Sequence, residues 1–137
     1  MDIVVLIGRV LFVVLFVSSA IGHFSQTEAM TGYARSQGVP APRIGVLASG
    51  VLMGLGALSI LLGVWADLGA LLLFIMLLPT AFFMHRFWAA DDPQTEQNEM
   101  IQFNKDLALA GASLMLFAFF AHTEELGLTL TGPLFHL

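Results

Sequence analysis

The chain has 137 residues and a net charge of −5; 58% of its residues are hydrophobic and only 11% are charged. An ordinary soluble domain carries about 25% charged residues, so this chain has too few charges to cover a water-exposed surface. Its five lysines and arginines do not supply the basic clusters that nucleic-acid phosphates require. The absence of cysteine excludes disulfides, and also thiolate zinc sites and iron–sulfur clusters held by the chain's own cysteines.

Four long apolar segments follow one another, each near the roughly 20 residues that cross a bilayer. We place them at residues 3–22, 44–64, 68–87 and 101–121. The first is interpreted as a retained helix rather than a signal peptide, because no basic residue precedes its apolar run. The sequence therefore predicts an all-α fold: a four-helix antiparallel transmembrane bundle, formed by residues 1–137 as one domain. We expect a multi-pass protein of the cell (inner) membrane.

The second segment contains many small residues, including Gly50 and Gly54 four positions apart. Small residues allow helix backbones to approach closely in lipid, so we expect this helix to pack centrally. Trp65 and Trp88 should lie at opposite faces of the bilayer, where aromatic residues anchor membrane helices.

The segments between these spans are short and polar. Residues 27–37 can form a helix on the membrane surface, and Asp92 followed by Pro93 is typical of a helix start. The tail, residues 122–137, is too short and too interrupted by Gly132 and Pro133 to form a fifth span.

Because the four segments alternate in direction, the first and third loops share one side of the bilayer. The polar residues near them form a candidate ligand-binding cluster: His23, His85, Arg86, Gln102, Lys105 and Asp106. Ionisable residues in membrane segments are costly and mark functional sites, yet residues near helix ends also serve as plain interfacial anchors. Asp106 is too short to reach the headgroups and needs a partner. A histidine beside a carboxylate could hydrogen-bond a quinone carbonyl and relay a proton.

Arg9 lies deeper in the first segment than a helix end, so its charge requires a partner. We predict a structural charge pair of Arg9 with Asp67, with Glu124 and Glu125 as the other candidates on that side. The four histidines fall on two sides of the bilayer without HxxxH or HExxH spacing. We therefore predict no metal site and no haem, and we assign no catalytic residue.

Several motifs follow one another in a family-specific order. After Arg9 come L-F-V-S-S-A-I-G-H-F (15–24), Y-A-R-S-Q-G-V-P (33–40), T-A-F-F-M-H (80–85) and F-N-K-D-L-A-L-A-G (103–111). In this order and spacing the chain resembles the DoxX family of membrane proteins over nearly its whole length. No single motif carries the resemblance alone.

The resemblance implies a four-helix membrane bundle linked to redox enzyme complexes, because the founding member resembles a small membrane subunit of a thiosulfate:quinone oxidoreductase. Three positions depart from the family pattern. The family commonly has lysine at the position of His23, often an acidic residue at Met53, and usually asparagine at Asp106. With this altered polar set, thiosulfate chemistry is not carried over.

Two function classes remain open. The chain is either a small subunit of a larger membrane redox complex, with or without a quinone contact, or a structural or assembly protein without chemistry of its own. An independent enzyme is disfavoured, because no nucleophile–base pair or cofactor motif appears. The expected partners are the lipid bilayer and other membrane-protein subunits, without nucleic acid, and no cofactor is expected to be held by this chain alone.

Overall fold

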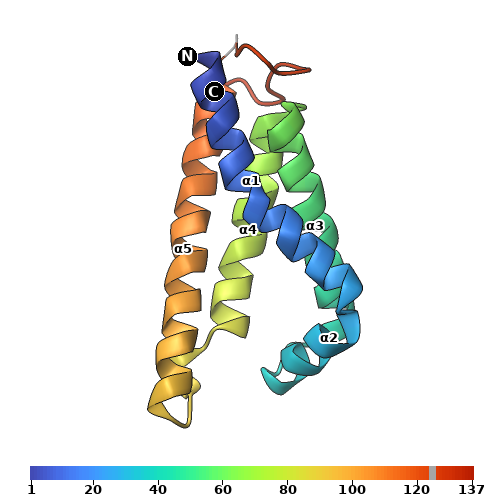
Figure 1. Ribbon diagram of the computed structural model, residues 1–137, viewed down its shortest axis with the longest axis vertical. Helices are drawn as coiled ribbons and strands as arrows, with labels where there is room; N and C mark the ends of the chain where they lie inside the picture. The colour runs from blue at the N-terminus through green and yellow to red at the C-terminus, as the bar shows by residue number, and fades with distance from the viewer. Residues whose placement is uncertain (124–125) are drawn as a thin grey trace.

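Helices form most of the computed structural model, which describes residues 1–123 and 126–137 (Figure 1). Four helices are long and apolar enough to cross a bilayer: α1 (Asp2–Ser25), α3 (Pro42–Leu62), α4 (Ala66–Met84) and α5 (Pro93–His122). The short helix α2 (Thr27–Ser36) follows α1, and the 3-10 turn η1 (Phe87–Ala89) follows α4. The described ranges contain no strand, and the predicted all-α arrangement of four membrane-spanning helices is confirmed.

The largest departure from the predicted boundaries is at α5, which begins at Pro93 rather than near residue 101. Asp92 caps this helix: its Oδ1 accepts hydrogen bonds from the backbone N of Gln94 at 3.1 Å and of Thr95 at 2.9 Å. Proline suits the first helical position because its missing N–H would be unpaired there anyway. The first turns of α5 are therefore polar but helical, and a count of apolar residues does not detect them.

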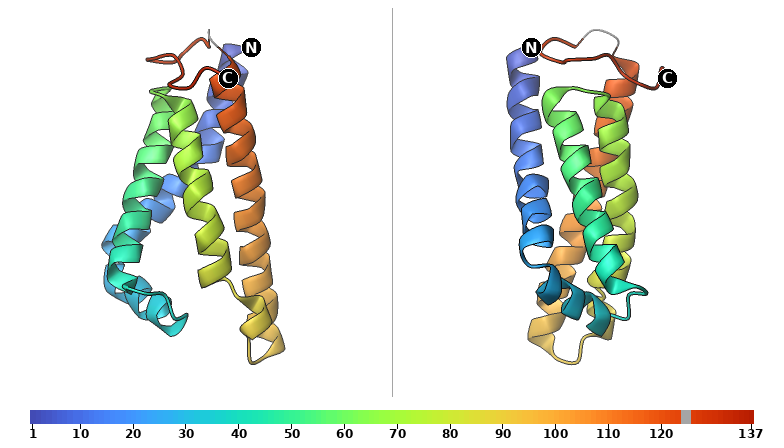
Figure 2. Two further views of the ribbon diagram at one scale, coloured as in Figure 1. Left: turned by 180° about the vertical axis from the view of Figure 1, so that it is seen from behind. Right: turned by 90° about the vertical axis from the view of Figure 1, so that its right-hand side faces the viewer.

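The four long helices pack in the order α1, α3, α4, α5, and α2 packs mainly on α3. Phe16 of α1, Ile60 of α3 and Leu73 of α4 are fully buried in the core between them. At the end of the molecule that carries α2 (Figures 1 and 2), hydrogen bonds of Tyr33 join α2 to Met84 of α4 and to Glu99 of α5. Both chain termini lie at the opposite end.

Glycines allow α3 to approach both of its neighbours. A Cβ atom added at Gly50 would lie 2.9 Å from the Cβ of His23 on α1. One added at Gly56 would lie 3.0 Å from the carbonyl oxygen of Gly69 on α4. At Gly54, the second member of the sequence pair, the nearest atom would be Ala20 Cβ at 3.9 Å, an ordinary contact. The close approaches of α3 are therefore at Gly50, toward α1, and at Gly56, toward α4, and only Gly50 belongs to the sequence pair.

The tail, residues 126–137, folds back over the end of the bundle that carries the termini (Figure 2). Thr131 donates its backbone N–H to the Gly63 carbonyl at 3.0 Å, and its Oγ1 accepts from the Trp65 N–H at 2.9 Å. Leu137 donates its N–H to the carbonyl of Ala121 at 3.4 Å. These bonds attach the tail to the turn between α3 and α4 and to the end of α5.

Candidate functional site

The end of α4 and the first half of α5 bring a histidine between two carboxylates. His85 directly follows the last residue of α4. Its Nδ1 lies 2.8 Å from Oε2 of Glu99, and its Nε2 lies 3.6 Å from Oδ2 of Asp106. Glu99 and Asp106 are seven residues apart on α5, which is about two turns and therefore the same helix face. The imidazole thus links the two carboxylates along α5.

The two carboxylates differ in their access to water. The Glu99 side chain is 18% exposed, whereas that of Asp106 is 6% exposed. Oδ2 of Asp106 has no hydrogen-bond partner among the described residues. Lys105 Nζ lies 3.6 Å from Oδ1 of Asp106 and donates to Oε1 of Gln102 at 2.5 Å. The structure therefore brings His85, Lys105 and Asp106 together, while Gln102 is exposed and reaches them only through Lys105.

Tyr33 of α2 also joins this site. Its hydroxyl lies 2.7 Å from Oε1 of Glu99 and 3.1 Å from the carbonyl oxygen of Met84. Either oxygen can accept the hydrogen bond that this hydroxyl donates. Burial, and then the hydrogen bond and charge of Glu99, raise the pKa of Tyr33 well above its ordinary value of 10.0. Tyr33 was not among the predicted site residues, because nothing in the sequence places residue 33 beside α5. Glu99 was not among them either, although its spacing of seven residues from Asp106 places both on one helix face, a signal that could have found it.

Arg86 forms no ion pair with Glu99 or Asp106 in the described part of the chain. Its Nη2 donates to the carbonyl oxygen of Gln37 at 2.6 Å, which ties the end of α2 to the end of α4. Beside it lies a pocket of about 310 Å³, bounded by the end of α2 and the start of α5 and lined in part by Gln37, Arg86 and Glu99. Arg86 therefore borders the cluster without belonging to it.

His23 was predicted to join the cluster, and the structure places it elsewhere. Its Nδ1 lies 2.8 Å from the Ser19 carbonyl oxygen on the same helix, and its Cβ lies against Gly50 of α3. Among the described residues, no hydrogen bond or ion pair links His23 to His85 or Asp106. The reason is the packing order: this end of α1 lies on α3 and α2, away from α4 and α5.

The predicted pairing of Arg9 with Asp67 is also replaced by other contacts. Arg9 is 3% exposed, and its guanidinium donates to the carbonyls of Ile60 at 2.7 Å, Leu128 at 2.8 Å and Leu61. Asp67 is fully buried, and its Oδ2 accepts from the backbone N–H groups of the tail residues Leu134 and Phe135 at 2.8 and 2.6 Å. Each charge is thus bound by backbone groups. The other candidate partners, Glu124 and Glu125, lie outside the described residues.

Comparison with protein families supports the resemblance seen in the sequence. The family profile named DoxX matches residues 4–86, which is more than half of the chain. The chain belongs to the DoxX family. It is accordingly a multi-pass membrane protein whose long helices contact the lipid bilayer. Comparisons with curated proteins and with solved structures find no significant match.

The matched range of this DoxX protein ends inside the cluster. His85 and Arg86 are its last two residues, while Glu99, Lys105 and Asp106 lie on α5 beyond it. The family match therefore includes the histidine of the site and does not extend to the carboxylates that flank it.

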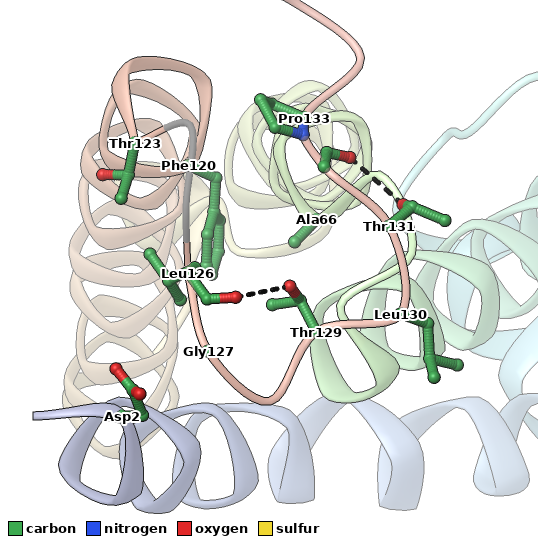
Figure 3. A pocket seen from close by; sticks show the side chains of 11 residues that line it. Asp2, Ala66, Phe120, Thr123, Leu126, Gly127, Thr129, Leu130, Thr131 and Pro133 are labelled. Atoms are coloured by element: carbon green, nitrogen blue, oxygen red, sulfur yellow. Dashed lines mark hydrogen bonds between the residues drawn. The ribbon is translucent and has the colours of Figure 1, made fainter.

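A larger pocket, of about 560 Å³, lies at the opposite end of the DoxX protein beneath the tail (Figure 3). Its lining combines apolar side chains such as Phe120 and Leu126 with the hydroxyls of Thr129 and Thr131 and the Asp2 carboxylate. Thr129 donates to the Leu126 carbonyl at 2.7 Å, a bond within the tail itself. None of the predicted cluster residues lines this pocket.

The chemistry of the cluster follows from the two imidazole nitrogens. A protonated ring can donate to Glu99 and Asp106 at once, whereas a neutral ring can donate to only one of them. Gain or loss of one proton at His85 therefore changes its contact with the more buried carboxylate. The arrangement can bind a hydrogen-bonding ligand and move a proton between the more exposed Glu99 and the less exposed Asp106. Among the described residues, no three or more His, Asp or Glu side chains are arranged so that they could hold one metal ion.

Proposed function

We propose that this DoxX protein is a small integral subunit of a larger membrane redox complex, and that its His85 cluster contacts the head group of a quinone. The observation that supports this proposal is the position of His85, with its two ring nitrogens directed at Glu99 and Asp106. The site lies at the end of a membrane-spanning helix, so a lipid-soluble molecule can reach it without leaving the bilayer.

The proposed chemistry divides between this chain and its partners. Reduction of a quinone to a quinol consumes two electrons and two protons. The chain has no cysteine to hold an iron–sulfur cluster, so an electron-transfer subunit of the complex supplies the electrons. His85 Nδ1 is engaged by Glu99, so the donor to the quinone carbonyl is Nε2–H, which lies 3.6 Å from Asp106 and makes no hydrogen bond to it. His85 passes on one of the two protons, which is replaced through Glu99 from the membrane surface, and the partner subunits supply the other. Asp106 stabilises the imidazolium form of His85 while the ring carries the extra proton.

The test compares two histidines that the structure separates. The tagged protein is purified in a mild detergent as wild type, His85→Ala and His23→Ala, and the quinone that each preparation retains is extracted and quantified. We expect His85→Ala to retain about 10-fold less quinone, because one charge-assisted hydrogen bond is worth roughly 1.4 kcal/mol or more. His23→Ala should match the wild type, since His23 belongs to α1, packs against Gly50 of α3 and lies away from the cluster.

The second readout is quinone reduction by the co-purified complex. We expect Asp106→Asn to keep complex assembly and quinone retention but to slow reduction, because asparagine fills the same space without a charge. If His85→Ala and Lys105→Ala both leave assembly, quinone retention and electron transfer unchanged, the cluster is an interfacial anchor. The chain is then the structural or assembly protein of the competing hypothesis.

A further inference from the structure

Four aromatic side chains form a cluster beside the polar site. Phe103 of α5 is at its centre. Its ring centroid lies 5.3 Å from that of Phe82, 5.4 Å from that of Phe87 and 5.7 Å from that of Trp88. The interplanar angles are 86°, 69° and 86°, so each of these rings meets Phe103 edge to face. This geometry is the favoured one for aromatic pairs, and it fixes the positions of the rings.

The aromatic cluster and the polar cluster share the same two helix ends. On α5, Phe103 lies one turn after Glu99 and one turn before Asp106, the two carboxylates that flank His85. On α4, Phe82 lies one turn before His85. The aromatic cluster and the His85 cluster therefore come from the same stretches of α4 and α5.

One part of the aromatic cluster is open to the surroundings. Phe82 is 52% exposed and Trp88 is 55% exposed, while Phe87 and Phe103 are half-buried behind them. Trp65, which is 48% exposed, has no ring pair among the described residues. It lies at the other end of α4, beside the tail. The chain thus holds two tryptophans of similar exposure, of which one adjoins the His85 site.

We propose that Trp88 and Phe82 form the contact surface for the ring of a quinone whose carbonyl binds His85, with Phe103 and Phe87 holding both side chains in place. This inference rests on the proposed function and adds the residues that bind the ring. A quinone ring is flat and electron-poor, and an exposed indole face is flat and electron-rich, so the two stack favourably. A hydrogen-bond donor at the edge of such a surface fixes how the ring is oriented.

The competing explanation is that Trp88 only anchors the helix at the membrane interface, as tryptophans commonly do. Because the chain has only two tryptophans, fluorescence distinguishes the two explanations. Trp65→Phe leaves Trp88 as the sole indole emitter, and Trp88→Phe leaves Trp65. Both variants are placed in nanodiscs and titrated with a short-chain ubiquinone analogue. A quinone that merely dissolves in the bilayer quenches both tryptophans alike and without saturation.

We expect Trp88 emission to be quenched with saturation at low quinone-to-protein ratios, and Trp65 emission to fall only linearly. In the Trp65→Phe background, Phe82→Leu should weaken the saturating component about 3- to 10-fold, the loss expected for one aromatic stacking contact. Phe117→Leu is the matched control, since Phe117 packs on Phe135 of the tail at the other end of the molecule. Equal, linear quenching of both tryptophans would overturn the inference.

The same titration separates this inference from the proposed function. Saturating quenching of Trp88 that persists in His85→Ala would support the ring surface and count against the role of His85. Retention of quinone that depends on His85, together with linear quenching of Trp88, would support the proposed function and refute the ring surface.

Discussion

Arg9 of α1 caps the C-terminal end of the neighbouring helix α3. Ile60 and Leu61 belong to the last turn of α3, whose carbonyls have no partner within the helix. The Arg9 guanidinium donates to both of them and to Leu128 of the tail. A positive charge at a helix C-terminus is also favourable to the helix dipole. Arg9 therefore joins α1, α3 and the tail at one point.

We predict that Arg9→Gln lowers the free energy of unfolding in detergent by about 3 kcal/mol. The estimate reflects hydrogen bonds from a charged donor at roughly 1.5–3 kcal/mol each, only part of which a glutamine can replace. The control is Arg35→Gln, since Arg35 is exposed on α2 and should change stability by less than about 0.5 kcal/mol. Equal unfolding curves for the two variants would show that Arg9 does not hold these elements together.

Tyr33 allows a direct titration, because it is the only tyrosine of the chain. Its raised pKa favours the neutral phenol in the folded state, so the stability that it contributes is complete below pH 10.0 and is lost as the pH rises above that value. We predict an absorbance titration midpoint well above 10.0 for the folded protein. Glu99→Gln should lower the midpoint part of the way, because the charge of Glu99 is removed while burial, the largest cause, remains. A midpoint near 10.0 in the wild type would contradict the contact.

For single residues, the sequence predicted which side chains share one helix face. It did not predict contacts between residues of different helices or of the tail. The spacing of Glu99 and Asp106 on one helix face was visible, and the structure directs both to His85, whereas Gln102 is exposed. The partners of Arg9 and Asp67 were not visible, because they are backbone groups, which every residue possesses. His23 was assigned to the cluster by its side of the membrane alone, and the packing order decides otherwise.

Between elements, the contact of α3 with α4 depends on Gly69. A Cβ atom added there would meet Ser59 Oγ and would lie 2.9 Å from the carbonyl oxygen of Gly56. We predict that Gly69→Ala lowers the free energy of unfolding by about 1–3 kcal/mol, the usual range for an overpacked contact. The matched control is Gly111→Ala on α5, where an added Cβ has no neighbour within 4 Å. If both variants unfold alike, close packing at Gly69 does not limit stability.

The number, order and approximate ends of the long helices could be predicted, because bilayer thickness and apolar length determine them. The start of α5 was misplaced since its first turns are polar, although Asp92 and Pro93 marked it. The folded-back tail could not be predicted: its main bonds to the bundle join backbone groups to Gly63 and Asp67. Hydropathy reflects side-chain type, so it does not predict hydrogen bonds made by backbone groups.

For the whole molecule, the two ends differ in their number of arginines and lysines. Arg35, Arg43, Arg86 and Lys105 lie near the α2 end, whereas Arg9 is the one basic residue near the termini. Positively charged residues favour the cytoplasmic side, so we predict that the α2 end faces the cytoplasm. Alkaline phosphatase fused after Leu137 should then be active outside, and the same enzyme inserted after Ala90 should be inactive. The reverse pattern of activities would refute this orientation.

The bonds of Arg9 also impose an order on biosynthesis. Arg9 emerges from the ribosome early, but its partner Ile60 follows 51 residues later and its partner Leu128 follows 119 residues later. At about 5–20 residues per second, the second delay is roughly 6–24 s. For that interval, the first helix carries a charge whose final binding site does not yet exist. Its guanidinium must be hydrated or held by the insertion machinery until the last residues of the chain are made.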